Sequence, residues 1–274
     1  MVRIAACQLS LNVEDAGFCV SQALDAISNA ISNKAEIIVL PELGTSGYFF
    51  QNIDEVKASS QNIGGEFVGM CLQLAKENDV VIVAGMNLEQ DQKLWNASVI
   101  IDNSGLVGWY AKAHLFGDEG KFFTPGENQP LVVKTSKGRI ATMICYDIEF
   151  TEWVRLAMLQ GAQLLALPTN WPIIGQTTTN PPMEVVRVQA AASQNKLVVA
   201  AADRTGAERG QTWVSASVIV DDEGVIKAQA DKSKNQESQI IYADVELPTD
   251  TRITEKNDVR KDRRPSLYSS ILNQ

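Results

Sequence analysis

Histidine is nearly absent from this chain of 274 residues, which contains only His114. A serine–histidine or cysteine–histidine mechanism would depend on that one imidazole, so we do not expect histidine catalysis. The four cysteines stand far apart, without any Cys-x-x-Cys spacing: Cys7, Cys19, Cys71 and Cys145. With one histidine available, they do not make up the ligand set of a zinc site. We therefore expect neither a metal nor a cofactor.

Long apolar runs and a positive net charge are also missing. The apolar runs, as at residues 37–40 and 164–167, are far shorter than the roughly 18 residues of a membrane helix. The amino terminus runs into polar sequence without the long apolar region of a signal peptide. With 24 Lys and Arg against 33 Asp and Glu, the net charge is −9, whereas nucleic-acid binding needs a basic surface. We expect a cytoplasmic protein with reduced thiols and no nucleic-acid or membrane partner.

Apolar periodicity predicts an α/β fold. Alternating strand and helix patterns occupy three parts of the chain, residues 2–40, 65–86 and 164–201. Turn sequences at 102–105 and 137–138 each join two strands into a hairpin, so antiparallel strands are mixed with parallel ones. Because no linker, repeat or charge block divides residues 1–274, we predict one domain. The tail from about residue 250 to 274 is expected to pack on a partner subunit.

Three chemically active side chains each follow a predicted strand. Glu42 ends the first βαβ unit, where α/β folds commonly bind ligands, and Lys112 ends the strand at 106–111. Taken singly, Glu42 also suits a helix or loop cap and Lys112 a surface lysine. Cys145 lies between a strand and a helix, where backbone N–H groups and a nearby ammonium would stabilise a thiolate, although an inert buried thiol is the alternative. The other cysteines suit the core.

Together, this acid, lysine and cysteine resemble the catalytic set of the nitrilase superfamily of carbon–nitrogen hydrolases. The resemblance covers nearly the whole chain and rests on several segments: Pro41-Glu42-Leu43, Tyr110 to Phe116, Ile144-Cys145-Tyr146-Asp147, Leu167-Pro168 and Asp262 to Tyr268. It implies a four-layer α-β-β-α sandwich of mixed sheets. It also implies that subunits pair as a homodimer or a larger homo-oligomer.

The resemblance further implies a role for each residue. Cys145 would attack an amide carbonyl, and Glu42 would take the thiol proton, give it to departing ammonia and then activate water. Lys112 and the backbone N–H of Tyr146 would hold the charge that develops on oxygen. A second acid often follows the lysine in this superfamily. We assign Glu119 to that position, with Asp118 as its competitor and a solvated loop charge as the alternative for both.

Five more residues are expected to contact substrate: Tyr48, Asn170, Trp171, Trp213 and Asp203. Asp203 stands where asparagine is usual in the superfamily. Together with Glu208 it could give the pocket a negative rim that holds an amine-bearing substrate. The structural alternative is that these acids pair with Arg204 or Arg209, and Trp171 has a plain core role as its alternative.

These residues predict an amidase that converts a small primary carboxamide, aliphatic or amine-bearing, to an acid and ammonia through a cysteine thioester. The alternatives are an N-carbamoyl amine or β-ureido acid hydrolase and a nitrilase, which differ only in pocket shape. A further alternative, from another class, is an inactive scaffold with the same fold. Intact Glu42, Lys112 and Cys145 argue against that scaffold.

Overall fold

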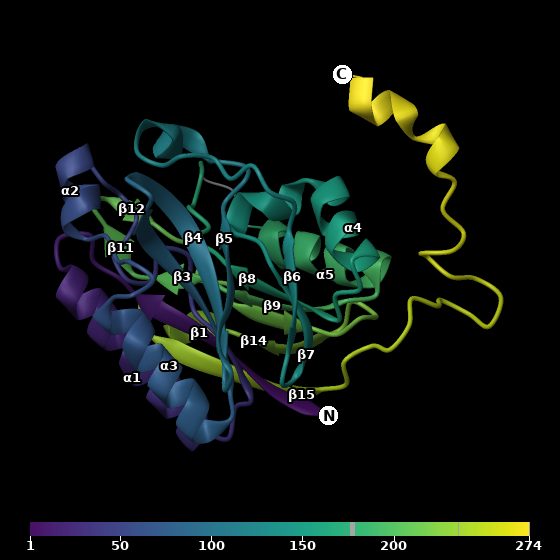
Figure 1. The fold of residues 1–274 in the computed structure, drawn as a ribbon, viewed down its shortest axis with the longest axis horizontal. Helices are drawn as coiled ribbons and strands as arrows, with labels where there is room; N and C mark the ends of the chain where they lie inside the picture. Colours follow the sequence, from purple (N-terminus) through teal and green to yellow (C-terminus); the bar gives the residue numbers. More distant parts are fainter. Residues whose placement is uncertain (176–178, 235, 274) are drawn as a thin grey trace.

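The computed structural model describes residues 1–175, 179–234 and 236–273. Two mixed β-sheets form its centre (Figure 1). The first sheet has the order β10 (Arg204–Thr205), β1 (Val2–Ser10), β2 (Ile37–Val39), β3 (Val81–Gln90), β4 (Lys93–Asp102) and β5 (Gly105–Ala111), and β15 (Gln239–Val245) also pairs with β1. The second has the order β14 (Ile226–Gln229), β13 (Val218–Val220), β9 (Val198–Ala202), β8 (Leu164–Pro168), β7 (Gly138–Thr142) and β6 (Leu131–Thr135). A short hairpin joins β11 (Ala207–Glu208) and β12 (Gln211–Thr212).

Helices cover the outer face of each sheet. α1 (Ala16–Ser32) and α3 (Glu66–Asn78) pack on the first sheet, and α4 (Thr151–Leu159) and α5 (Met183–Asn195) pack on the second (Figure 1). The short α2 (Ile53–Ala58) lies outside these layers. The predicted four-layer α-β-β-α arrangement is therefore confirmed. Among the residues that the structure describes, no helix is both long and apolar enough to cross a bilayer.

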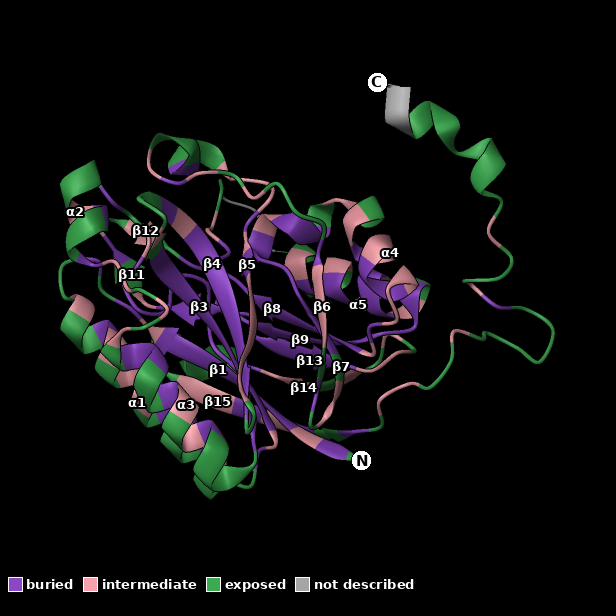
Figure 2. Cartoon of the chain, in the orientation of Figure 1, coloured by how far each residue is buried: buried purple, intermediate pink, exposed green. Residues whose placement is uncertain are grey.

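Three apolar layers hold the sandwich together, and β1 contributes to two of them. Its side chains alternate, so Ala5 and Cys7 face the helices while Ile4 and Ala6 face the second sheet. All four are fully buried, which explains why this strand is a nearly continuous apolar run. Figure 2 shows the same division over the whole molecule, with buried strands inside and the exposed helix faces outside.

Most of the predicted elements are present, with two notable differences. The helix expected at 14–33 spans Ala16–Ser32, and the hairpin expected around 102–105 joins β4 and β5. The strand expected at 214–220 is shorter, because β13 begins at Val218. β15 was missed, although its buried Ala243 and Val245 alternate with exposed or half-buried neighbours. It fills the edge of the first sheet by pairing antiparallel with β1.

The segment after β15 leaves the body of the molecule (Figure 1). Its Val259 packs against the core beneath α4 and α5, but beyond that point the tail extends outward. Leu267 is 59% exposed and Ile271 is 54% exposed.

The first sheet brings its strand ends close to the turn after β2. Gly85 in β3 faces that turn, and a Cβ atom there would lie 2.2 Å from the Pro41 carbonyl oxygen and 2.7 Å from the Glu42 Cα. No side chain fits in that gap. The absence of a side chain at position 85 therefore allows Glu42 to take its position.

We predict that Gly85→Ala destabilises the protein by about 2 kcal/mol or more, because the added methyl must push the turn away from β3. Gly69→Ala is the matched control. Gly69 lies in α3 with no heavy atom within 4 Å of its Cβ position, so alanine should stabilise the helix by about 0.5–1 kcal/mol. Denaturant unfolding measures both changes. Equal stabilities for the two variants would contradict the packing argument.

Candidate active site

Glu42 is a fully buried carboxylate on the turn after β2. Its Oε1 accepts hydrogen bonds from Lys112 Nζ at 2.6 Å and from Asn96 Nδ2 at 2.7 Å. Its Oε2 is buried and has no hydrogen-bond partner among the described residues. Burial raises the pKa of Glu42 to about 7; Lys112 opposes this shift and Glu119 adds to it. Glu42 therefore has one anchored oxygen and one oxygen free to accept a proton.

Lys112 follows β5 and lies between two carboxylates. Its Nζ donates to Glu42 Oε1 and, at 2.7 Å, to Glu119 Oε1. Burial alone would lower the pKa of Lys112, but the two carboxylates outweigh it and raise the pKa well above its usual value. Lys112 is therefore a permanent ammonium at the centre of the site.

Glu119 occupies a 3₁₀ turn, Gly117–Lys121, that brings it over Lys112. Besides Lys112, its carboxylate accepts from the Tyr48 hydroxyl at 2.6 Å and from the Phe116 backbone N–H at 3.1 Å. Burial and the charge of Glu119 raise the pKa of Tyr48 well above its usual value, so Tyr48 stays a donor. Asp118 instead points outward and pairs with exposed Lys121 at 2.9 Å. The structure thus brings Glu119, and not Asp118, to the lysine.

Cys145 opens the 3₁₀ turn Cys145–Glu149, three residues after the end of β7 and ahead of α4. Its φ of +44° lies in the left-handed region, which is rare for a residue with a side chain and is typical of strained functional turns. Burial and the negative charge of Glu42 raise the pKa of the Cys145 thiol well above its usual value, while Lys112 opposes them. The resting group is therefore a thiol beside a carboxylate.

Asp147 holds this turn against the loop that follows Lys112. One carboxylate oxygen accepts from the Ile144 N–H at 2.9 Å and the Tyr110 hydroxyl at 2.8 Å. The other accepts from the His114 N–H at 3.0 Å and lies 2.7 Å from His114 Nδ1. A fully buried carboxylate with four partners fixes the position of its neighbours. The lone histidine therefore orients the loop after Lys112.

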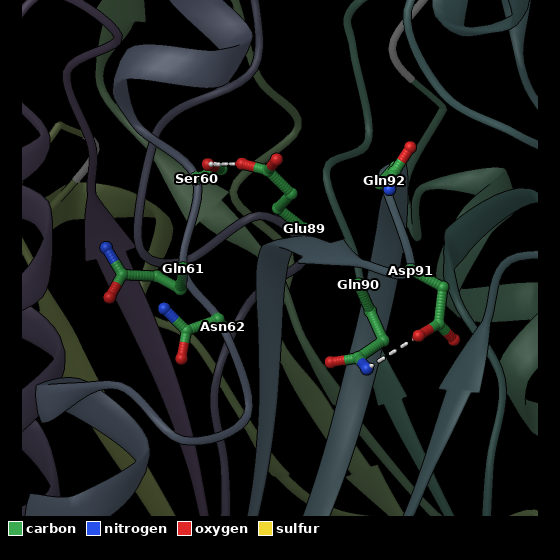
Figure 3. Close-up of a pocket in the computed structure, with 7 residues that line it drawn as sticks. All are labelled: Ser60, Gln61, Asn62, Glu89, Gln90, Asp91 and Gln92. Carbon is green, nitrogen blue, oxygen red and sulfur yellow. Dashed lines mark hydrogen bonds between the residues drawn. The ribbon is translucent and has the colours of Figure 1, made fainter.

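Cys145 lines a cavity of about 270 Å³. Its walls include the aromatic side chains of Phe116, Tyr146 and Trp171, and its rim carries Glu149, Glu184 and Arg187. A hollow of about 300 Å³ elsewhere, at the tip of the β3–β4 hairpin, is lined only by polar residues between Ser60 and Gln92 (Figure 3). It contains none of the predicted site residues. The cavity at Cys145 is therefore the candidate active site.

The remaining predicted residues lie at different depths. Asn170 donates from Nδ2 to the Glu42 carbonyl oxygen at 3.1 Å, so it positions the turn. Trp213 is buried, with its ring centroid 5.6 Å from that of Tyr48 and 4.4 Å from the Arg204 guanidinium carbon. It does not line the cavity at Cys145 and instead supports Tyr48 from behind.

Asp203 was expected to contact substrate, but it does not line the cavity at Cys145. Its carboxylate is fully buried and accepts backbone N–H groups of Trp171, Arg204 and Ala216 at 2.9–3.0 Å. These bonds hold the ends of β8 and β9 together. They occupy both carboxylate oxygens of Asp203. Burial raises the pKa of Asp203 to about 6, and the three N–H groups oppose that shift. For Glu208, the structural alternative of pairing with an arginine is observed, because its carboxylate lies 3.1 Å from the Arg204 guanidinium.

Two groups of functional residues were missed from the sequence. Asn96 on β4 anchors Glu42, and the backbone of the same residue accepts the Lys112 N–H at 2.9 Å. Its signal was weak, since one polar residue at the start of an apolar run does not show which face it occupies. The sequence also did not show that three charged residues share the cavity rim: Glu149, Glu184 and Arg187. Glu149 lies about 35 residues before the other two, so they meet only in the folded chain.

Known proteins resemble this chain over most of its length. The chain matches the carbon–nitrogen hydrolase family over residues 3–253. It is 31% identical to a nitrilase of Pyrococcus abyssi over 98% of this chain and 99% of that protein. It is 30% identical to a 2-oxoglutaramate amidase of Bacillus subtilis over 86% and 88% of the two chains. The crystal structure of an amidase from Nesterenkonia sp. superposes with a TM-score of 0.78 at 25% identity, over 98% of this chain and 96% of that one.

We predict that Glu42 makes the protein less stable as the pH rises. Its pKa is raised from 4.5 to about 7, so the folded state holds a proton that the unfolded chain releases at lower pH. The resulting stability is fully present below pH 4.5 and is lost as the pH rises through 7. The difference in melting temperature between the native protein and Glu42→Gln should therefore decline across this range. A difference that stays constant or grows would contradict the raised pKa.

Proposed function

Because the chain belongs to the carbon–nitrogen hydrolase family, we propose that it is an amidase that converts a small primary carboxamide to a carboxylic acid and ammonia through a thioester on Cys145. The observation that carries this proposal is the Lys112 ammonium, bonded to both Glu42 and Glu119 beside the cavity that Cys145 lines. Glu42 supplies a base, Lys112 a charge stabiliser and Cys145 a nucleophile. Amide hydrolysis needs all three.

Acylation begins with the substrate carbonyl carbon over Cys145. As the sulfur attacks, the thiol proton passes to Glu42 Oε2, the oxygen that has no other partner among the described residues. The carbonyl oxygen becomes an oxyanion, which the Lys112 ammonium and the Tyr146 backbone N–H stabilise. The carbon–nitrogen bond then breaks, Glu42 returns its proton to the leaving nitrogen, and ammonia departs. The acyl group remains on sulfur as a thioester.

Deacylation uses the same groups in reverse. Water takes the place of ammonia, and Glu42 removes its proton as the oxygen attacks the thioester carbon. The carbon–sulfur bond breaks, the thiolate recovers the proton from Glu42, and the carboxylic acid leaves. Glu119 keeps the Lys112 ammonium in place throughout, and the Tyr48 hydroxyl holds Glu119. Both half-reactions thus need only one mobile proton.

Carbamoyl amines and nitriles are the other substrates that this chemistry could serve, because a thiol also attacks their electrophilic carbon. A cavity of about 270 Å³ suits a short primary amide. An inactive scaffold has little to support it. Burying two carboxyl groups around one ammonium costs stability, and an inactive scaffold would gain nothing in return.

We predict that Cys145→Ala lowers ammonia release from short primary amides by at least about a thousandfold, because no nucleophile remains. Cys71→Ala, which removes a buried thiol from α3, should remain active and is the matched control. A panel of amides, N-carbamoyl amines and nitriles identifies the substrate class, and intact-mass measurement during turnover should detect the acylated Cys145. Full activity of Cys145→Ala would reject the mechanism, and release from carbamoyl amines alone would reject the amide assignment.

We also propose that two chains associate and that the tail from about residue 250 packs on the partner subunit. Leu267 and Ile271 are more than half exposed on a segment that extends away from the body. Burial against a second chain would remove this apolar surface from water.

We predict that Leu267→Asp weakens this association at least tenfold, because a carboxylate would have to be desolvated at the interface. Met70→Asp is the control, since Met70 is 42% exposed on α3, far from the tail. Light scattering across a dilution series measures the mass. A native protein that is monomeric at all concentrations, or equal masses for both variants and the native protein, would exclude this role of the tail.

A further inference from the structure

The rim of the cavity at Cys145 carries an excess of negative charge. Arg187 on α5 lies between two acids, with its Nε 2.8 Å from Glu149 Oε2 and its Nη1 3.5 Å from Glu184 Oε1. One guanidinium and two carboxylates leave a net charge of −1 among the described rim residues. All three side chains are partly exposed, so they meet whatever enters the cavity.

The guanidinium is poorly placed to bind a substrate carboxylate. Two of its nitrogens already face the carboxylates of Glu149 and Glu184, so an incoming anion would compete with both acids and be repelled by them. Burial raises the pKa of Glu149, Arg187 opposes that shift, and the charge of Glu184 adds to it. Both acids contact the same guanidinium, so they are close enough to act on one bound group. An incoming cation would find carboxylate oxygens on both sides of the arginine.

The cavity walls favour the same kind of group. Phe116 and Tyr146 meet edge to face with ring centroids 5.2 Å apart, and Trp171 completes the wall. Aromatic faces attract ammonium groups, most strongly where water is partly excluded. Acid and aromatic side chains thus surround one space, which begins at the nucleophile and ends at the rim.

We infer that this cavity selects primary amides that carry a second, protonated amine distant from the carboxamide, and that Glu149 and Glu184 determine the selection. This inference rests on the proposed amidase function, because it places the carboxamide at Cys145 and the ammonium at the rim. The amine selectivity first assigned to Asp203 thereby belongs to two residues that line the cavity. The cavity should accept uncharged amides less well and amides with a distal carboxylate least.

Three amides of equal chain length test the inference: an ω-amino amide, its uncharged alkyl counterpart and its ω-carboxy counterpart. The measured quantity is kcat/KM for ammonia release. We expect the amino amide to exceed the alkyl amide at least fivefold, the size of effect expected for one partly exposed charge pair, and the carboxy amide to fall below both. The preference should shrink between about 50 and about 500 mM salt, because salt screens exposed charges.

Variants then assign the preference to the rim. Glu184→Gln and Glu149→Gln should each reduce the ratio of amino to alkyl amide about fivefold, and Arg187→Gln should increase it. Glu127→Gln is the matched control, since Glu127 is exposed and outside the cavity lining, and it should leave the ratio unchanged. Opposite effects of removing an acid and removing the arginine would not arise from a merely structural ion pair.

The outcomes separate this inference from the proposed function. Turnover of the alkyl amide with equal or lower turnover of the amino amide keeps the amidase and overturns the rim assignment. A preference for the carboxy amide that Arg187→Gln abolishes also overturns it, in favour of an anion site. If no amide is hydrolysed, the proposed function fails, and calorimetry with the three amides on Cys145→Ala decides the inference by itself. Tighter binding of the amino amide supports the inference, and equal binding rejects it.

Discussion

A buried ammonium between two buried carboxylates is the interaction on which the rest of the structure depends. The Lys112 ammonium lies between the carboxyl groups of Glu42 and Glu119, and a buried charge at any of these positions would be costly without its partner. Lys112 Nζ lies 2.6 Å from Glu42 Oε1 and 2.7 Å from Glu119 Oε1, and each of the three side chains comes from a separate part of the chain. Such an arrangement requires rigid supports, because a small displacement would leave a charge unpaired in a dry environment.

Three of the supports are buried carboxylates, those of Asp147, Asp203 and Glu208, and each of their oxygens accepts a hydrogen bond. Asp147 ties the turn at Cys145 to the loop after Lys112, and Asp203 ties together the ends of two strands of the second sheet. Glu208 accepts the N–H groups of Tyr48 and Phe49 and thereby fixes the segment that holds Glu119. A satisfied network of this kind fixes one geometry, whereas a partly satisfied one would be costly. The acids near the site thus divide into supports and reacting groups.

Local sequence was sufficient wherever the signal lies within one strand, helix or turn. The helices over 16–32 and 183–195 follow from apolar spacing, and the position of Cys145 at a strand-to-helix turn follows from the patterns on each side of it. β15 was missed, because its short alternation gains its meaning only beside β1. The family followed from three separated motifs in one order, which a single motif would not have indicated.

The sequence by itself determined the α/β class and the order of its motifs along the chain, because periodicity and motif spacing are local properties, and the resemblance carried by those motifs implied the four layers. Only the tertiary structure decided how the acids divide between roles. It buried Asp203 against backbone N–H groups, brought Glu119 instead of Asp118 to the lysine, and placed Glu149 beside Arg187 at the cavity rim. A carboxylate has the same letter in the sequence whether it faces water, a backbone N–H or a substrate. Its role depends on neighbours that lie far away along the chain.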